Sequence, residues 1–206
     1  MVQLSSVLAF CFAGAAMASP MVEVAKRGKS VPISITSLEY EGEGCPAGSL
    51  TGSLDPNTGE FDVFYRELDA SIKPGDDKVK VKCHIEVGLQ TSADTQLVVI
   101  SGTYRGHVRL TKGGWAKNQN QYKFKNNPGT TDMEWVFKGP TDVSTAFTNE
   151  LATTFKSGCG SDGGAYTLII NNYLTMTTEG SGEGEISIQE LDGAIKQSVK
   201  LSTEDC

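Results

Sequence analysis

The chain has 206 residues, and its 25 acidic residues outnumber its 18 lysine and arginine residues, for a formal net charge of −7 at pH 7. An acidic chain is repelled by phosphate backbones and by anionic membrane surfaces, so nucleic acid and membranes are disfavoured as partners. The length suits one domain, and we expect a monomer.

Residues 1–18 have the character of a secretory signal peptide. The stretch from Leu4 to Ala18 is apolar or small and uncharged, and Ala16-Met17-Ala18 fits the small-x-small rule for cleavage after Ala18. A membrane anchor is the alternative, but the stretch is shorter than the roughly 20 residues that cross a bilayer. We therefore expect a secreted, extracellular protein.

A dibasic pair, Lys26-Arg27, follows the leader. One interpretation is a processing site, so that the mature chain begins at Gly28. The other is a solvated charge pair near a frayed terminus. Both remain open, and we expect residues 19–32 to form a propeptide or a disordered segment ahead of a domain over residues 33–206.

Four cysteines remain once Cys11 is removed with the leader: Cys45, Cys83, Cys159 and Cys206. An even number of cysteines in an exported chain predicts two disulfides, with three possible pairings. We favour the sequential pairing, Cys45–Cys83 and Cys159–Cys206. Zinc binding is disfavoured because no two of these cysteines are two to four residues apart, and we expect no metal or cofactor.

The apolar pattern predicts an all-β fold. Apolar residues alternate with polar or small ones over Cys83–Leu89, Val98–Leu110, Tyr166–Met176 and Ile195–Leu201. Turn residues separate these segments at 55–59, 73–77, 126–129 and Asp192-Gly193. The stretch 147–155 fits a helix or a strand, and its threonines favour a strand. We predict an antiparallel β-sandwich of roughly nine to eleven strands, with a closed barrel as the alternative.

Several sequence blocks resemble a family of small secreted, mainly fungal proteins catalogued as a domain of unknown function. The blocks are the Gly-x-Gly-Cys-Pro-x-Gly-Ser signature at residues 42–49, the strand that begins at Cys83, the block that begins Tyr104-Arg105-Gly106, the segments 137–140 and 157–160, and the terminal Cys206. The resemblance covers nearly all of the chain beyond the leader. It implies export, a β-sandwich and two disulfides, and it supplies no catalytic or binding residues.

A basic stripe is predicted on one strand. Arg105, His107 and Arg109 alternate with Gly106 and Val108, so they share one face. Their positive charge suits contact with an anion or an acidic glycan. The alternative is a solvated strand face whose charges pair with carboxylates on neighbouring strands.

Trp115 and Tyr122 are candidates for sugar binding. They lie in a segment rich in glycine and amides, residues 113–122, which we interpret as a loop. An indole ring can stack on the apolar face of a pyranose, while amides bind the sugar hydroxyls. The alternative is a tryptophan folded over the end of the sandwich. Trp135 shares a face with Met133 and Phe137, so we assign it to the core.

No residue is assigned a catalytic role. Glycoside hydrolysis requires two carboxylates in a cleft, and no motif distinguishes a pair among Glu39, Glu41, Asp62, Glu86 and Glu134. The main hypothesis is a secreted non-enzymatic protein that binds a glycan, a cell wall or a host surface. The alternatives are a carbohydrate-active hydrolase and a secreted effector or inhibitor that binds a host protein.

Overall fold

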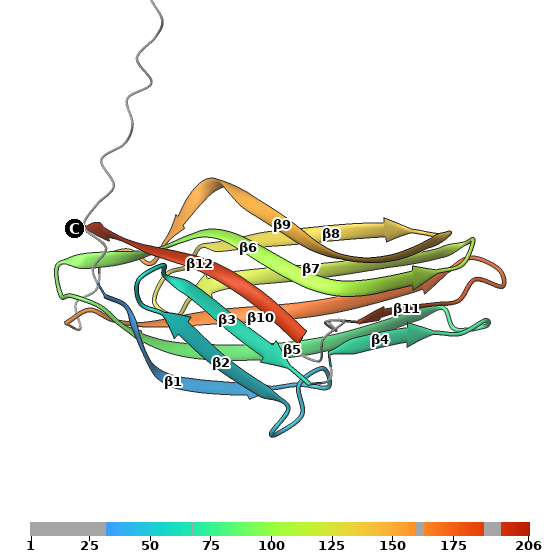
Figure 1. Cartoon of the computed structure of the whole chain (residues 1–206), viewed down its shortest axis with the longest axis horizontal. Helices are drawn as coiled ribbons and strands as arrows, with labels where there is room; N and C mark the ends of the chain where they lie inside the picture. Colours follow the sequence, from blue (N-terminus) through green and yellow to red (C-terminus); the bar gives the residue numbers. More distant parts are fainter. Residues whose placement is uncertain (1–31, 67, 160–162, 188–194) are drawn as a thin grey trace, which may run out of the picture.

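The computed structural model describes residues 32–206 except 67, 160–162 and 188–194, and these residues form two antiparallel sheets (Figure 1). Twelve strands are described, one more than the upper end of the expected range, and the all-β prediction is confirmed. No helix in this part of the chain is long and apolar enough to cross a membrane. The signal peptide with Ala18, the Lys26-Arg27 pair and the Asp192-Gly193 turn lie outside the described residues.

The first sheet, sheet A, has five strands in the order β1-β5-β10-β7-β8. Their bounds are β1 Ser34–Glu41, β5 Lys78–Gln90, β10 Ala165–Thr178, β7 Gly114–Phe124 and β8 Thr130–Lys138. All of its strand pairs are antiparallel.

The second sheet, sheet B, has seven strands, and β6 is its central strand. Their bounds are β2 Leu50–Asp55, β3 Glu60–Tyr65, β12 Ile195–Asp205, β6 Thr95–Leu110, β11 Gly184–Ser187, β4 Asp69–Ile72 and β9 Thr141–Lys156. One edge of β6 pairs with β12 and then with β11, and its other edge pairs with β9. The strand predicted over residues 147–155 is therefore confirmed as part of β9.

The core between the sheets follows from the alternation in the sequence. In the middle of β5 and β10 alternate residues are buried. Ile85, Val87, Leu168 and Ile170 are examples, and they have no exposed surface. These side chains meet those of sheet B, such as Phe61, in one cluster. Burial of this apolar surface is the main driving force for the fold.

A polar network crosses the centre of this core. The Asn172 amide donates to the Tyr65 hydroxyl, which donates to Gln197 Oε1 over 2.7 Å. Gln197 Nε2 in turn donates to the Tyr122 hydroxyl over 3.1 Å. Asn172 and Tyr122 belong to sheet A, while Tyr65 and Gln197 belong to sheet B. Buried polar groups need such partners, so the network fixes how the two sheets face each other.

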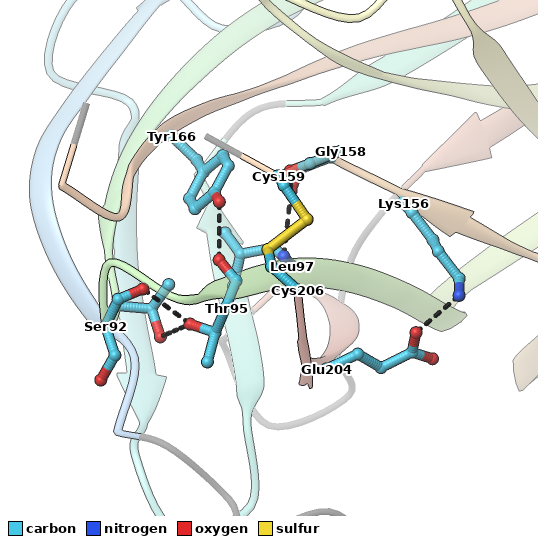
Figure 2. The surroundings of a disulfide bond; sticks show 11 residues. Ser92, Thr95, Leu97, Lys156, Gly158, Cys159, Tyr166, Glu204 and Cys206 are labelled. Carbon is cyan, nitrogen blue, oxygen red and sulfur yellow. Dashed lines mark hydrogen bonds and ion pairs between the residues drawn. A yellow bond between two sulfur atoms is a disulfide. The ribbon is translucent and has the colours of Figure 1, made fainter. Parts of the chain in front are cut away.

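Both predicted disulfides are present. Cys45 and Cys83 are joined, and so are Cys159 and Cys206. Figure 2 shows the second bridge among polar contacts that also hold the end of the chain, including an ion pair of 2.5 Å between Lys156 and Glu204. The bridge therefore ties Cys206, the residue that follows β12, to the segment that follows β9.

The bridge at the C terminus should contribute strongly to stability. Its cysteines are 47 residues apart, and closing a loop of that length is worth about 4 kcal/mol in the chain-entropy model. We expect the double variant C159S/C206S to lose about that much free energy of unfolding in a urea titration. An unfolding midpoint equal to that of the wild type would contradict this role.

Buried phenols should make the protein sensitive to alkali. Burial raises the pKa of Tyr65, Tyr104 and Tyr122 above the ordinary phenol value. As the pH rises past about 10, phenols of the unfolded chain lose protons while these three keep theirs, so stability falls. We expect tyrosinate absorbance to rise in two steps, the second coinciding with loss of circular dichroism. A single step in the folded protein would contradict the expected burial.

Candidate functional site

A groove of about 820 Å³ lies on the outer face of sheet A. It occupies the end of the sandwich where β10 ends and β7 begins, away from the C terminus (Figure 1). Its lining combines one tryptophan with lysines, hydroxyl and amide side chains and turn glycines. The lining residues are Lys78, Lys80, Gly113, Gly114, Trp115, Lys117, Gln119, Lys138, Gly139, Thr175, Thr177 and Glu179.

The strand register brings these residues together from four strands. Trp115 on β7 lies opposite Lys138 on β8 and opposite Thr177 on β10, and Thr177 lies opposite Lys78 on β5. The next row of the same face contains Lys117, Thr175 and Lys80. Neighbouring strands are about 4.8 Å apart, so Lys138 lies one strand spacing from Trp115 on one side, and Lys78 lies two spacings away on the other, beyond Thr177.

Trp115 is half-buried and contributes to the groove, but the segment around it is not the expected loop. Residues 114–124 form strand β7, whose side chains alternate between the two faces of sheet A. Gln119 therefore lines the groove, while Asn118 and Asn120 point into the core with no exposed surface. A glycine- and amide-rich composition suggested a loop, yet pairing with β10 and β8 outweighs that local preference.

Tyr122 does not belong to the groove, which corrects its assignment as a candidate ligand contact. It has no exposed surface, and its hydroxyl accepts the hydrogen bond from Gln197. Trp115 and Tyr122 are seven residues apart on one strand, and an odd separation places side chains on opposite faces. Trp135 packs inside as expected, stacked on Tyr104 with ring centroids 5.7 Å apart.

The lysines of the groove differ in their partners. Lys117 lies 3.4 Å from a Glu134 carboxylate oxygen, and Lys80 lies 4.5 Å from the centre of the Tyr173 ring. Among the residues that the structure describes, no carboxylate is within ion-pair distance of Lys78 or Lys138. The groove therefore holds positive charge that is not neutralised by neighbouring side chains.

Glycine-rich turns close one end of the groove. Gly113 has a φ of +88°, and a Cβ there would be 2.5 Å from the Glu179 carbonyl oxygen. A Cβ on Gly139 would overlap the Thr111 carbonyl group. Backbone hydrogen bonds join these turns, from Gly139 to Gly114 over 2.9 Å and from Glu179 to Gly113 over 2.9 Å. The wall beside Trp115 is therefore closely packed backbone.

The basic stripe lies on the outer face of β6, where two of its three members have acidic partners. His107 Nε2 is 2.7 Å from an Asp142 carboxylate oxygen, and Arg109 is 3.5 Å from Glu185. The structure thus favours the alternative interpretation, a strand face with charges paired across strands. Arg109 also lines a small groove of about 270 Å³ with Glu183 and Glu185, where the acidic groups would repel an anion.

The carboxylates considered for hydrolysis do not line the groove. Glu39 and Glu86 are opposite each other on β1 and β5, and Glu86 interacts with Lys125 over 3.3 Å. The hydrogen bond from Lys125, followed by that from His84, lowers the pKa of Glu86, although partial burial opposes the shift. His84 also lies 2.7 Å from the Asn171 amide oxygen. The Glu86 carboxylate therefore stays ionised and serves to pair with its neighbours on the sheet surface.

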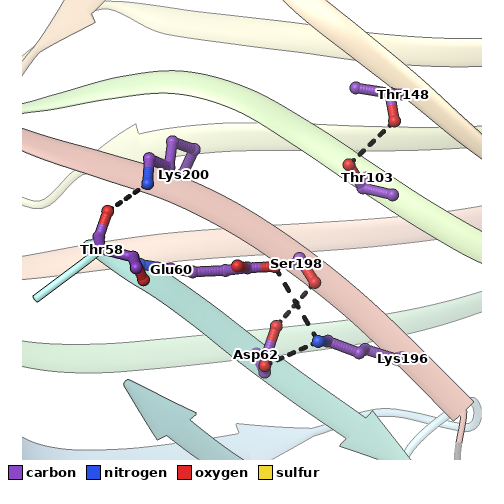
Figure 3. Close-up of polar contacts among 8 residues, drawn as sticks. All are labelled: Thr58, Glu60, Asp62, Thr103, Thr148, Lys196, Ser198 and Lys200. Carbon is purple, nitrogen blue, oxygen red and sulfur yellow. Dashed lines mark hydrogen bonds and ion pairs between the residues drawn. The ribbon is translucent and has the colours of Figure 1, made fainter. Parts of the chain in front are cut away.

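Asp62 lies on the other side of the molecule, on the outer face of sheet B. Figure 3 shows its carboxylate between Ser198, which donates over 2.6 Å, and Lys196 at 2.9 Å. Lys196 also reaches Glu60. Opposite charges are thus paired on this face, in contrast to the lysine-rich groove.

Within the described part of the chain, no cluster of three or more histidine, cysteine or acidic residues could hold a metal ion.

A second groove, of about 470 Å³, lies beside the C-terminal disulfide. It is bordered by Phe124, Tyr166 and Cys159 among other residues. Phe124 and Tyr166 contact each other edge to face, and the Tyr166 hydroxyl donates to the Thr95 carbonyl over 2.6 Å. Because these rings already contact each other and the Tyr166 hydroxyl has a partner, this groove offers a weaker binding surface than the groove at Trp115.

Sequence reasoning identified Trp115 but missed the groove lysines. Lys78 and Lys80, Lys117, and Lys138 come from three sequence segments that become neighbours only through strand pairing. The alternation of Lys78, Lys80 and Lys82 with valines was a signal for one basic strand face. Nothing in the local pattern indicated that this face would lie near Trp115.

Comparison with known proteins places this architecture in a family. A family model described as a domain of unknown function, DUF4360, matches residues 32–206. The chain belongs to this family. A relative in Arthroderma benhamiae, described as an uncharacterized secreted protein, is 26% identical over 179 residues, covering 84% of this chain and 72% of the relative. The expected secreted location of this DUF4360 protein is confirmed, and its two disulfides agree with an oxidising compartment.

Similarity to a solved structure is slight. The structure of TmCBM61 in complex with β-1,4-galactotriose matches over 83% of this chain and 90% of that chain, with 8% identity and a TM-score of 0.26. At this level of similarity we draw no conclusion about the DUF4360 chain from it.

The packed wall of the groove can be tested by a pair of glycine substitutions. Gly113→Ala forces a side chain into a left-handed conformation and against the Glu179 backbone, so we expect a loss of about 2 kcal/mol or more. Gly75→Ala is the matched control, because Gly75 has a φ of +96° but nothing within 4 Å of its Cβ position. It should cost about 1 kcal/mol. Equal losses in urea unfolding would show that the wall is not closely packed.

Proposed function

We propose that this protein is a secreted, non-enzymatic glycan-binding protein whose binding site is the groove around Trp115. The observation that carries the proposal is the combination in one groove of a half-buried indole with Gln119, Thr175 and Thr177. A sugar ring stacks on an aromatic face through its C–H groups, and its hydroxyls bind amide and hydroxyl side chains. The groove supplies both kinds of contact.

The groove offers this surface without a large rearrangement. Its floor is formed by paired strands and its end by hydrogen-bonded turns. A rigid site loses little conformational entropy when a ligand binds. An extended polysaccharide could therefore lie across the strands and pass over Trp115.

The lining of the groove does not favour hydrolysis. Glycosidases use two carboxylic acids on either side of the scissile bond. Glu179 is the one carboxylate among the described residues that line the groove. Binding without cleavage is the function that this set of side chains supports.

Trp115 should dominate glycan binding. We expect Trp115→Ala to weaken retention on the bound polysaccharide at least tenfold, because removal of a central aromatic contact costs more than about 1.4 kcal/mol. Retention would be measured by affinity electrophoresis in gels containing chitin, β-glucan, galactan or polygalacturonate. Val136→Ala is the matched control, since Val136 is exposed on the neighbouring strand of the same sheet but does not line the groove.

A second measurement separates binding from a general effect on folding. The chain has two tryptophans, so Trp135→Phe leaves Trp115 as the sole tryptophan, whose emission can be followed selectively. Saturable change of its emission on addition of glycan is expected if the indole contacts sugar. The absence of retention on all of these polysaccharides, with wild-type protein that is folded by circular dichroism, would overturn the proposal.

A further inference from the structure

We propose that the groove selects acidic polysaccharides, specifically chains of uronic acids whose carboxylates contact its lysines. This inference rests on the proposed glycan-binding function and adds the chemical class of the ligand. Four lysines line the groove against one glutamate. The whole chain carries a net charge of −7, so this concentration of cations is opposite in sign to the protein as a whole.

The arrangement of the lysines suits a carboxylate carried on a stacked sugar. Lys138 is directly opposite Trp115 on one side, and Lys78 lies two strands away on the other. A carboxylate bonded to a pyranose ring lies near the edge of the ring. A ring stacked on the indole therefore directs its carboxylate sideways, toward one of these ammonium groups.

Two of the four groove lysines are also available to form an ion pair with a ligand carboxylate. Lys117 is partly neutralised by Glu134 and Lys80 contacts Tyr173, whereas Lys78 and Lys138 have no carboxylate partner among the described residues. The outer face of sheet B shows the opposite pattern, with Lys196 between Asp62 and Glu60. Unneutralised cations in a groove raise the local concentration of an anionic polymer.

A nucleic acid is the other anionic polymer with rings that can stack, and the structure disfavours it. Binding to a phosphate backbone draws on a broad positive surface that extends beyond the point of contact. Here the remainder of sheet A's outer face mixes the acidic residues Glu39, Glu86 and Asp132 with Lys82 and Lys123, so no broad positive surface extends from the groove. We therefore assign the groove to a polyuronate, and single-stranded DNA becomes a competitor in the test.

The test compares ligands that share a backbone and differ in charge. We expect full-length mature protein to bind polygalacturonate at least tenfold more tightly than the same polymer after full methyl esterification, which removes the charge and keeps the sugar. Affinity should fall steeply between 50 mM and 500 mM NaCl because salt screens exposed charges. Binding would be followed by Trp115 fluorescence in the Trp135→Phe background.

Variants provide the matched comparison within the protein. K78Q/K138Q should weaken polygalacturonate binding about tenfold and leave binding of the methyl ester unchanged. K123Q/K125Q removes the same charge from the other end of β7 and the turn after it, and it should leave both affinities unchanged. An equal effect of the two double variants would overturn the inference, because it would reflect net charge alone.

The outcomes separate the inference from the proposed function. Equal binding of polygalacturonate and its methyl ester would overturn the selection for charge while glycan binding stands. Equal or tighter binding of dextran sulfate or single-stranded DNA would overturn the assignment to uronates. Failure of every polysaccharide to bind would overturn the proposed function itself.

Discussion

The structure depends on one constraint, the register of β10 between β5 and β7. This register buries Leu168, Ile170 and Asn172 on the inner face of sheet A. The same register places Thr175 and Thr177 outside, between the lysines of β5 and Trp115 of β7. Because side chains alternate with a period of two, a slip by one residue would exchange the faces and destroy the core and the groove together.

The polar network in the core also stabilises the position of sheet A relative to sheet B. Asn172 and Tyr122 of sheet A reach Tyr65 and Gln197 of sheet B. An apolar core alone tolerates small displacements of one sheet over the other, whereas buried hydrogen-bonding groups are costly when displaced from their partners. Contacts on the inner face of sheet A thus hold in place the strands whose outer face forms the groove.

Local charge, and not net charge, determines which partner the outer surface suits. The acidic balance of the chain argues against anionic partners as a whole, yet strand pairing concentrates lysines beside Trp115. Elsewhere, as at His107 with Asp142 and at Lys196 with Asp62, neighbouring strands pair opposite charges. A β-sandwich with one unneutralised basic groove can therefore be acidic overall and still attract an anionic polymer.

The sequence by itself determined the fold class, the two disulfides and the inward packing of Trp135. Alternation of apolar residues is a local property of each strand, and the number of cysteines can be counted directly from the sequence. It indicated Trp115 as a candidate binding residue, but it misplaced Tyr122, since a strand was taken for a loop. Only the tertiary structure decided that Lys78, Lys138 and Trp115 share a groove. Antiparallel pairing joins residues far apart in sequence, and no local pattern specifies which strands become neighbours.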